Sequence, residues 1–423
     1  MTVTFKINSL PGRIALAMAT LACSTVFGGI MLSHFVVRTM ADRRIMIGRE
    51  ALISAASRLT DSPRVQIRLA EAEMTEPSNP QILAQAQAHA RQAVNLSPWN
   101  YRYWQALATS QEFIGNSDDS EGALRTASRL APRYSEVNWA LANLMLRQGQ
   151  LQESLKPFRL AATANRELLP SALDLLWQAS SRDVDVLKKL TDGDATLQLP
   201  LTQFLVEQSQ SDAAVAIYLK IDSIAKINSP SAAAFISSML EVNPQTAREL
   251  WLDAVSAIIP QTTGGLIWNG GFEAESLKQF NQFDWMISPS DYARIGFDRG
   301  VARGGRRSLR VSFAGRDTTR LEGEIRQLVA LTQGRRYRLE CYAKAQNLVT
   351  PEGPRLALLG RNGVIAVSEP VLAASNEWQN LAIEFTAKLE MMTYVSIVRR
   401  PRYDYDEPTR GTIWFDDFKL TEQ

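Results

Sequence analysis

Histidine and cysteine, the residues that most often build metal centres and catalytic triads, are scarce in this sequence. The 423 residues contain two histidines, His34 and His89, and two cysteines, Cys23 and Cys341. Cys23 lies inside an apolar run and His34 borders it, so one residue of each type is left elsewhere. We therefore expect no disulfide framework, no Cys/His zinc site and no histidine-based triad.

Carboxylate pairs are the remaining candidates for catalysis. Glu340 and Glu384 fall on outward positions of two expected strands, where paired acids could perform the acid/base work of a polysaccharide lyase or hydrolase. No nucleophile elbow, phosphate-binding loop or metal-binding histidine set accompanies them in the sequence. We therefore predict a protein that is not an enzyme, with a lyase or hydrolase as the alternative.

Alternating polar and aromatic residues in the C-terminal part suit sugar recognition. A sugar site needs an aromatic plane for the apolar ring face and polar groups for the hydroxyls. Alternation places four polar or aromatic residues on outward positions, where we expect them to share one face, and two tryptophans are further stacking candidates, of which at least one is expected in the core. The candidate ligand-binding residues are Arg338, Glu340, Tyr342, Tyr394, Trp285 and Trp378.

The charge pattern is compatible with acidic ligands without requiring them. The formal net charge is +2, so the total predicts no polyanion partner, and we expect no nucleic acid. Arginine runs at residues 303–310, 335–338 and 399–402 suit uronate or phosphate recognition. They suit protein contacts or protection of sheet edges equally well.

These side chains need a β-scaffold, and the sequence after about residue 264 has the pattern of one. Short alternating segments are separated by Gly, Pro, Asn and Asp, with no helical run between them. This pattern predicts an antiparallel β-sandwich over residues 263–423. The expected strands are Ser308–Phe313, Gln327–Leu331, Arg336–Ala343, Arg355–Leu359, Val364–Ser368, Asn380–Ala387, Thr393–Val398 and Thr412–Leu420.

The preceding region, residues 41–262, has apolar residues at three- and four-residue steps, which predicts helices. Within it, Pro98 and Pro132 are 34 residues apart, as are Gly115 and Gly149. This frame resembles the tetratricopeptide repeat, whose period is 34. The resemblance implies an α-helical solenoid with a groove for a protein partner. The candidate partner-binding residues are Arg102, Gln105, Phe113, Trp139, Asn143 and Arg147; alternatively, Trp139 packs against a neighbouring helix.

Three motifs of the C-terminal part occur in a suggestive order. Trp268-Asn-Gly-Gly-Phe-Glu273 opens it, Gly305-x-x-Ser-Leu-x-Val311 follows, and Trp414-Phe-Asp-Asp-Phe418 closes it. Together they resemble jelly-roll carbohydrate-binding modules of the galactose-binding-like type. The resemblance implies glycan binding and a structural Ca²⁺ near the joined termini, held by Glu273 and by Asp416 or Asp417. Backbone carbonyls would have to complete such a site; alternatively, these acids cap turns without metal.

An apolar segment near the N-terminus predicts a membrane anchor within residues 1–40. Residues 14–37 carry no charged side chain, and their helical length of about 36 Å exceeds the ~30 Å of a hydrocarbon core. Cleavage as a signal peptide, or lipidation at Cys23, is the alternative. The charges that flank the segment conflict on orientation, because Lys6 and Arg13 precede it and four arginines follow it.

The order of anchor, helical repeat and sandwich is similar to that of bacterial proteins associated with exopolysaccharide production. We therefore expect a single-pass inner-membrane scaffold with a periplasmic body, because a glycan-binding sandwich is most useful outside the cytoplasm. Such a scaffold would bind a protein through its repeats and a glycan through its sandwich. A purely protein-binding scaffold is a further alternative.

Overall fold

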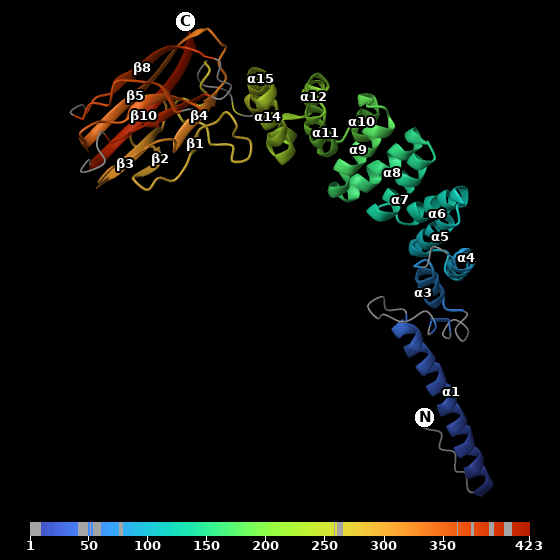
Figure 1. Cartoon of the computed structure of the whole chain (residues 1–423). Coiled ribbons are helices and arrows are strands. Elements are labelled where there is room, and N and C mark those ends of the chain that lie inside the picture. Colours follow the sequence, from blue (N-terminus) through green and yellow to red (C-terminus); the bar gives the residue numbers. More distant parts are fainter. Residues whose placement is uncertain are drawn as a thin grey trace. The chain divides into compact units, whose positions relative to one another are not determined.

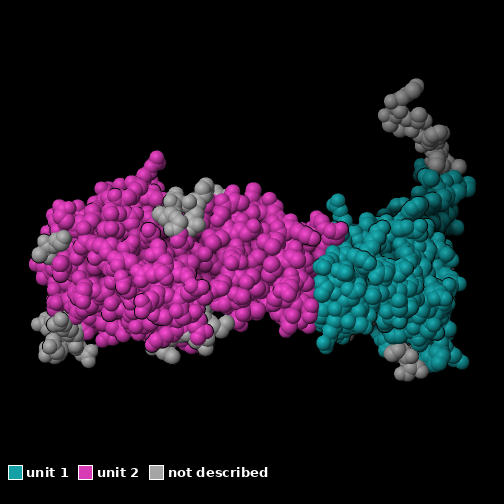
Figure 2. Space-filling view, turned by 90° about the horizontal axis from the view of Figure 1, so that it is seen from above, with its two compact units in different colours: residues 1–190 teal, residues 191–423 magenta. Residues whose placement is uncertain are grey.

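The chain divides into two compact units, residues 1–190 and 191–423 (Figure 2). The computed structural model describes residues 10–40, 50, 52–53, 61–75, 79–257, 259, 265–361, 363–373, 376–388, 393–401 and 408–423. In the described residues the first unit is helical, and the second contains helices followed by two antiparallel sheets. The domain boundary expected at residues 262–263 lies outside the described residues and stays a prediction.

Helix α1 (Leu10–Met40) is long and apolar enough to cross a membrane over Leu10–Ser33 by length and composition. Its hydroxyl groups bond within the helix: Thr25 Oγ1 donates to the carbonyl of Ala22 at 2.9 Å, and Ser33 Oγ to that of Ile30 at 2.7 Å. Internal satisfaction of polar groups is what a hydrocarbon environment requires. Lys6 and three of the arginines that bear on orientation lie outside the described residues.

The first unit continues as helices joined by short turns, as the sequence pattern predicts. Helix α7 begins 34 residues after α5, and α8 begins 34 residues after α6. Gly115 and Gly149 occupy equivalent turns with φ of +79° and +77°, which a glycine adopts without strain. These helices are α3 (Pro63–Glu73), α4 (Pro80–Leu96), α5 (Tyr101–Phe113), α6 (Ser117–Leu130), α7 (Ser135–Arg147), α8 (Leu151–Ala164), η1 (Arg166–Leu168), α9 (Leu169–Ala179) and α10 (Val184–Thr191).

Small residues let neighbouring helices of this unit approach closely. Ala108 and Ala127 are buried, and Ala161 has no exposed surface. Asparagine side chains accept hydrogen bonds from the first backbone N–H groups of several helices, as Asn79 does at α4 and Asn100 at α5. The repeated alanines and caps explain why the helices recur at a fixed spacing.

The second unit begins with helices, as expected for residues 41–262. Its helices are α11 (Ala195–Glu207), α12 (Ser211–Tyr218), α13 (Ser223–Ile227), α14 (Pro230–Val242) and α15 (Pro244–Ser256). Asp194 and Asp222 cap α11 and α13, and Asn243 caps α15. The lengths of 5–13 residues leave each helix dependent on tertiary packing for stability.

Two five-stranded sheets follow, and we name each after its central strand (Figure 1). The β9 sheet has the order β1 (Met286–Ile287), β4 (Ile325–Val329), β9 (Thr393–Val398), β6 (Arg355–Gly360) and β7 (Gly363–Val367). The β10 sheet has the order β2 (Ala293–Asp298), β3 (Ser308–Arg316), β10 (Thr409–Glu422), β5 (Arg336–Val349) and β8 (Gln379–Thr386). The eight expected strands are present, and β1 and β2 are additional.

The inner faces of the two sheets form one core. Leu339 and Cys341 of β5 have no exposed surface, and neither have Val395 and Ile397 of β9. The expected alternation of inward and outward positions is therefore confirmed in β5, whereas in β9 the outward residues Ser396 and Val398 are buried as well and only Tyr394 is partly exposed.

Four aromatic residues join α15 to the segment that leads into the sandwich, and we call this cluster the aromatic junction: Trp251, Trp268, Phe280 and Phe283. The Trp251 ring is fully buried and lies edge-to-face on Trp268, with ring centroids 5.2 Å apart. Its Nε1 donates to the carbonyl of Phe280 at 2.9 Å. The helices α11–α15 and the sandwich thus belong to one compact unit because they share this core.

Removing the Trp251 ring should destabilise the whole second unit. Trp251→Ala leaves a large cavity and a carbonyl without its donor, and such a change typically costs about 3–5 kcal/mol. The measurement is denaturant unfolding of the full chain in detergent. Trp99→Ala is the control, because Trp99 is 85% exposed and its loss should change stability by less than about 0.5 kcal/mol. Equal stability of the two variants would show that the junction is not a core.

Candidate functional site

The two tyrosines of the expected ligand face lie in different sheets. Tyr342 is on β5 in the β10 sheet, whereas Tyr394 is on β9 in the β9 sheet. Because the inner faces pack together, the two outer faces point away from each other. The expectation that Arg338, Glu340, Tyr342 and Tyr394 share one face is therefore wrong. Alternation within a strand indicates whether a side chain faces the core or the solvent. It does not indicate which of the two sheets the strand belongs to.

On the β10 sheet, the expected polar residues bond one another. Arg338 Nη1 donates to Glu384 Oε1 at 2.9 Å, and Arg338 Nε donates to Glu340 Oε2 at 3.3 Å. The hydrogen bonds that Arg338 donates to Glu340 and Glu384 raise the pKa of its guanidinium. Both glutamates thus share one guanidinium, and the paired acids considered for catalysis are held by a cation rather than presented free to a substrate.

The Tyr342 ring is covered on one side. The guanidinium carbon of Arg303 lies 3.4 Å from the ring centroid, and the same side chain forms an ion pair with Asp417. A sugar could stack on that side of the ring only after Arg303 moved away. The structure therefore places Tyr342 beside a cation that competes for the same aromatic face.

The two candidate tryptophans differ in exposure. Trp285 is 4% exposed and packs on Phe418, with ring centroids 4.7 Å apart. Its Nε1 donates to the carbonyl of Asn269 at 3.1 Å. Trp285 is thus a core residue, and its assignment as a stacking platform is corrected. Trp378, before β8, is half-buried.

The outer face of the β9 sheet presents a tyrosine on its central strand. Tyr394 is half-buried, and the exposed guanidinium of Arg326 lies 5.2 Å from its ring centroid. In the next row of the sheet, Arg326 pairs with Ser396, and Ser396 with Ala357. Ser396 and Ala357 have no exposed surface, and Leu328 and Val398 on the same face are 4% exposed, so the accessible outward side chains of these strands are those of Arg326, Tyr394, Arg355 and Leu359. The ring and the guanidinium can contact the apolar and polar parts of one sugar residue.

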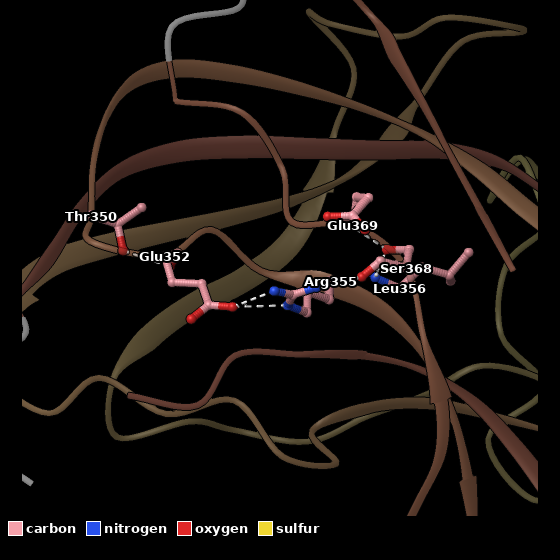
Figure 3. A network of polar contacts seen from close by, with 6 residues as sticks. All are labelled: Thr350, Glu352, Arg355, Leu356, Ser368 and Glu369. Carbon is pink, nitrogen blue, oxygen red and sulfur yellow. Dashed lines mark hydrogen bonds and ion pairs between the residues drawn. The ribbon is translucent and has the colours of Figure 1, made fainter. Parts of the chain in front are cut away.

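A network of polar contacts fixes a second arginine at one end of this sheet (Figure 3). The Arg355 guanidinium donates through Nε to Glu352 Oε1 at 3.0 Å and through Nη1 to the carbonyl of Ser368 at 2.7 Å. Ser368 Oγ donates to the carbonyl of Glu369 and accepts from the Leu356 amide. These bonds hold the β6 end of the face in one arrangement.

The three carboxylates expected near the joined termini do gather around Gly271. A methyl group at Gly271 would lie 3.7 Å from an oxygen of both Asp416 and Asp417, and 4.0 Å from Cγ of Glu273. Glu273 Oε1 accepts from the amides of Arg306 and Arg307. At Gly305, φ is +63° and a Cβ would lie 2.3 Å from that oxygen, so only glycine fits.

Protein donors already occupy much of this carboxylate cluster. Asp416 Oδ2 accepts from the amides of Arg303 and Gly304, at 2.8 and 3.2 Å. Burial raises the pKa of Asp416 to about 6. The Arg307 guanidinium donates to the carbonyls of Phe272 and Ala274. The carboxylate cluster thus has arginines as its positive charges and backbone amides as its hydrogen-bond donors.

Calcium at this carboxylate cluster stays a prediction, but the arrangement of its donors does not fit the ion. A Ca²⁺ site needs 6–8 oxygen ligands that face the ion, whereas here amides and guanidiniums face the oxygens. Within the described residues, no group of three or more Asp, Glu, His or Cys side chains is placed to hold a metal.

Calcium should therefore leave the stability of the second unit unchanged. The full chain in detergent is melted once with Ca²⁺ and once with a chelator, and we expect equal transition temperatures. Stabilisation by Ca²⁺ would contradict this, because a ligand that binds the folded state raises its melting temperature. Magnesium in place of calcium controls for ionic strength.

In the first unit, some expected partner-binding residues line one cavity of about 430 Å³ between α3, α5 and α7. Arg102 and Gln105 are among them, together with Tyr101 and Tyr134, whose ring centroids are 4.6 Å apart. Arg102 Nε donates to the hydroxyl of Tyr101 at 3.2 Å. The two tyrosines were not predicted from the sequence, although they begin or precede equivalent helices of successive repeats.

The other expected partner-binding residues lie elsewhere. Trp139 packs edge-to-face on Phe158 of α8, with ring centroids 5.3 Å apart, and the Asn143 side chain donates to the carbonyl of Trp139. Arg147 pairs with Glu112 at 2.7 Å, and Phe113 is 46% exposed. Trp139 therefore packs against a neighbouring helix, which is the alternative considered for it.

No protein-family model matches the sequence, and no curated protein shows a significant match. Among solved structures, one described as "CBM4 structure and function" has 21% identity and a TM-score of 0.28, over 37% of this chain and 99% of that chain. The CBM22-1 xylan-binding domain of Paenibacillus barcinonensis Xyn10C has 14% identity and a TM-score of 0.24, over 36% of this chain and 91% of that domain's chain. TmCBM61 in complex with β-1,4-galactotriose has 15% identity and a TM-score of 0.26, over 38% and 100%.

Proposed function

We propose that this protein is a membrane-anchored, non-catalytic scaffold that binds a glycan on the outer face of the β9 sheet. The observation that carries the proposal is the pair of Tyr394 and Arg326, 5.2 Å apart on neighbouring strands. Of the two tyrosines expected at a glycan site, Tyr394 is the one whose ring is less closely covered, because its arginine lies 5.2 Å from the ring centroid whereas Arg303 lies 3.4 Å from that of Tyr342. An aromatic plane with an adjacent donor is the minimal set for a sugar ring and its hydroxyls.

The chemistry of the same face argues for binding rather than catalysis. Hydrolysis of a glycosidic bond needs two carboxyl groups on either side of the bond. The described outer residues of β4, β9 and β6 are Arg326, Leu328, Tyr394, Ser396, Val398, Arg355, Ala357 and Leu359, a set without a carboxylate. This face suits recognition of a chain that other proteins make or export.

The helical unit supplies the second part of the proposed scaffold. We assign its repeats to the tetratricopeptide type and its cavity at Arg102, Tyr101 and Tyr134 to a segment of a partner protein. Aromatic and arginine side chains dominate the energetics of protein interfaces, which supports this assignment. Helix α1 would hold the scaffold in the inner membrane with its body in the periplasm, where an envelope polysaccharide is exported or assembled.

A glycan array on the full chain in detergent tests the proposal, with Tyr394→Ala as the decisive variant. Loss of the stacking plane should weaken binding of any neutral glycan that the wild type retains by about tenfold or more, equivalent to roughly 1.4 kcal/mol. Tyr342→Ala is the matched control, since it removes the same side chain from the opposite face. We expect it to bind as the wild type does.

Both variants must melt as the wild type does for the comparison to count. Weaker binding of Tyr342→Ala with Tyr394→Ala unaffected would move the site to the β10 sheet. If the wild type binds neither neutral nor acidic glycans, a purely protein-binding scaffold is favoured. New reducing ends or unsaturated uronates in the incubated glycan would reveal a hydrolase or a lyase.

A further inference from the structure

We propose that the outer face of the β10 sheet carries a second site, which binds an acidic polysaccharide through Arg294, Arg310 and Lys344. The site lies on the opposite side of the sandwich from Tyr394 and uses charge instead of an aromatic plane. The identification of its ligand as a glycan rests on the proposed function; the cationic site itself rests on the geometry below.

The sheet register places the three cations close together. Trp414 of the central strand pairs with Arg310 on β3 and with Lys344 on β5. Neighbouring strands are about 4.8 Å apart, so Arg310 and Lys344 stand about 10 Å apart across β10. Arg294 on β2 pairs with Ser312, two residues beyond Arg310, which puts the two arginines at a diagonal of about 7–8 Å.

Side chains beneath the cations are fixed by hydrogen bonds. Trp414 is 5% exposed, and its Nε1 donates to Asp298 Oδ2 at 2.8 Å. Arg310 Nε donates to Ser312 Oγ at 3.1 Å, and Ser312 Oγ lies 3.1 Å from the Thr412 hydroxyl. The result is a floor with a buried indole and two hydroxyls that can also bond a ligand.

Positive charge on this part of the sheet is poorly compensated. Asp298 lies 3.9 Å from Arg310, at the limit of an ion pair, and already accepts from Trp414 and from the amide of Gly300. In the part of the chain that the structure describes, no carboxylate forms an ion pair with Arg294 or Lys344. Three cations thus face one carboxylate that is engaged elsewhere.

In the other half of the same sheet, arginines form ion pairs with carboxylates. Arg338 bonds two glutamates there, and Arg303 bonds Asp417. Among the described residues, Arg294 and Lys344 have no such partner, and Arg310 has only Asp298 at 3.9 Å.

The arrangement favours an acidic polysaccharide over other polyanions. Single-stranded nucleic acid is held by aromatic side chains on which bases stack, and the indole of this patch is buried. Binding to a membrane surface needs apolar side chains that insert, whereas Arg294, Arg310, Lys344 and the two hydroxyls present polar ends. Carboxylates repeated along a sugar chain fit spaced guanidinium and ammonium groups.

The test compares two polymers on the full chain in detergent: polygalacturonate, which is a polymer of uronates, and neutral galactan. The double variant Arg310→Gln/Lys344→Gln should bind polygalacturonate at least about tenfold more weakly than the wild type. Its salt dependence should also be shallower, because fewer charged contacts are screened. Binding of neutral galactan, if the wild type shows it, should not change.

Arg338→Gln is the matched control, because it removes a compensated cation from the same face and should leave polygalacturonate binding unchanged. An equal loss in this control, or no loss in the double variant, would overturn the proposal. If the double variant melts earlier than the wild type, Arg294→Gln replaces it, with a weaker but measurable loss expected and no loss contradicting the site.

Two further measurements distinguish this site from the proposed site at Tyr394 and a glycan ligand from nucleic acid. Tyr394→Ala should keep polygalacturonate binding that depends on Arg310 and Lys344, so loss in one variant and not the other shows which of the two sites has failed. A duplex oligonucleotide that binds as tightly as polygalacturonate, with the same loss in the double variant, would overturn the assignment to a glycan.

Discussion

Burial of the two inner sheet faces against each other decides where every other side chain of the sandwich can act. Once Leu339, Cys341, Val395 and Ile397 share a core, Tyr342 and Tyr394 must point in opposite directions. The sandwich therefore has two outer faces of different chemistry. One offers a tyrosine and an arginine beside buried residues, and the other offers cations above a buried indole.

The same packing extends beyond the sandwich through the aromatic junction. Trp251 of α15 is buried among residues that lead into the first strands, so the last helices and both sheets form one compact unit. The sandwich is therefore packed directly against α15 through these rings. Such a connection suits a scaffold, because a bound glycan is then held in a defined orientation to the helices of the same unit.

Much of this fold follows from local sequence patterns. The 34-residue spacing of Gly115 and Gly149 predicts the helical offset because both glycines fill the same turn. Alternation predicts the inward and outward residues of β5 and β9. Strand β1 has two residues, too few to show alternation. Strand β2 does alternate, with Ala293, Ile295 and Phe297 on one side and Arg294, Gly296 and Asp298 on the other, so the strand was not predicted although the pattern was present.

The candidate site was harder to predict, because it depends on contacts between distant segments. Sheet membership separates Tyr342 from Tyr394, and no pattern within either strand reports it. Burial of Trp285 follows from its packing on Phe418, 133 positions later in the sequence. The cover over Tyr342 comes from Arg303, in a turn held by Asp416 and Asp417. The carboxylate cluster itself was found because three short motifs mark both ends of the sandwich.

Hydroxyl-radical footprinting of the full chain tests the central claim most directly. Oxidation of each tyrosine is measured by mass spectrometry with and without a neutral glycan that the protein retains on an array. The account predicts that the glycan protects Tyr394 and leaves the oxidation of Tyr342 unchanged, since the two rings lie on opposite faces. Protection of Tyr342 with Tyr394 unchanged would contradict it.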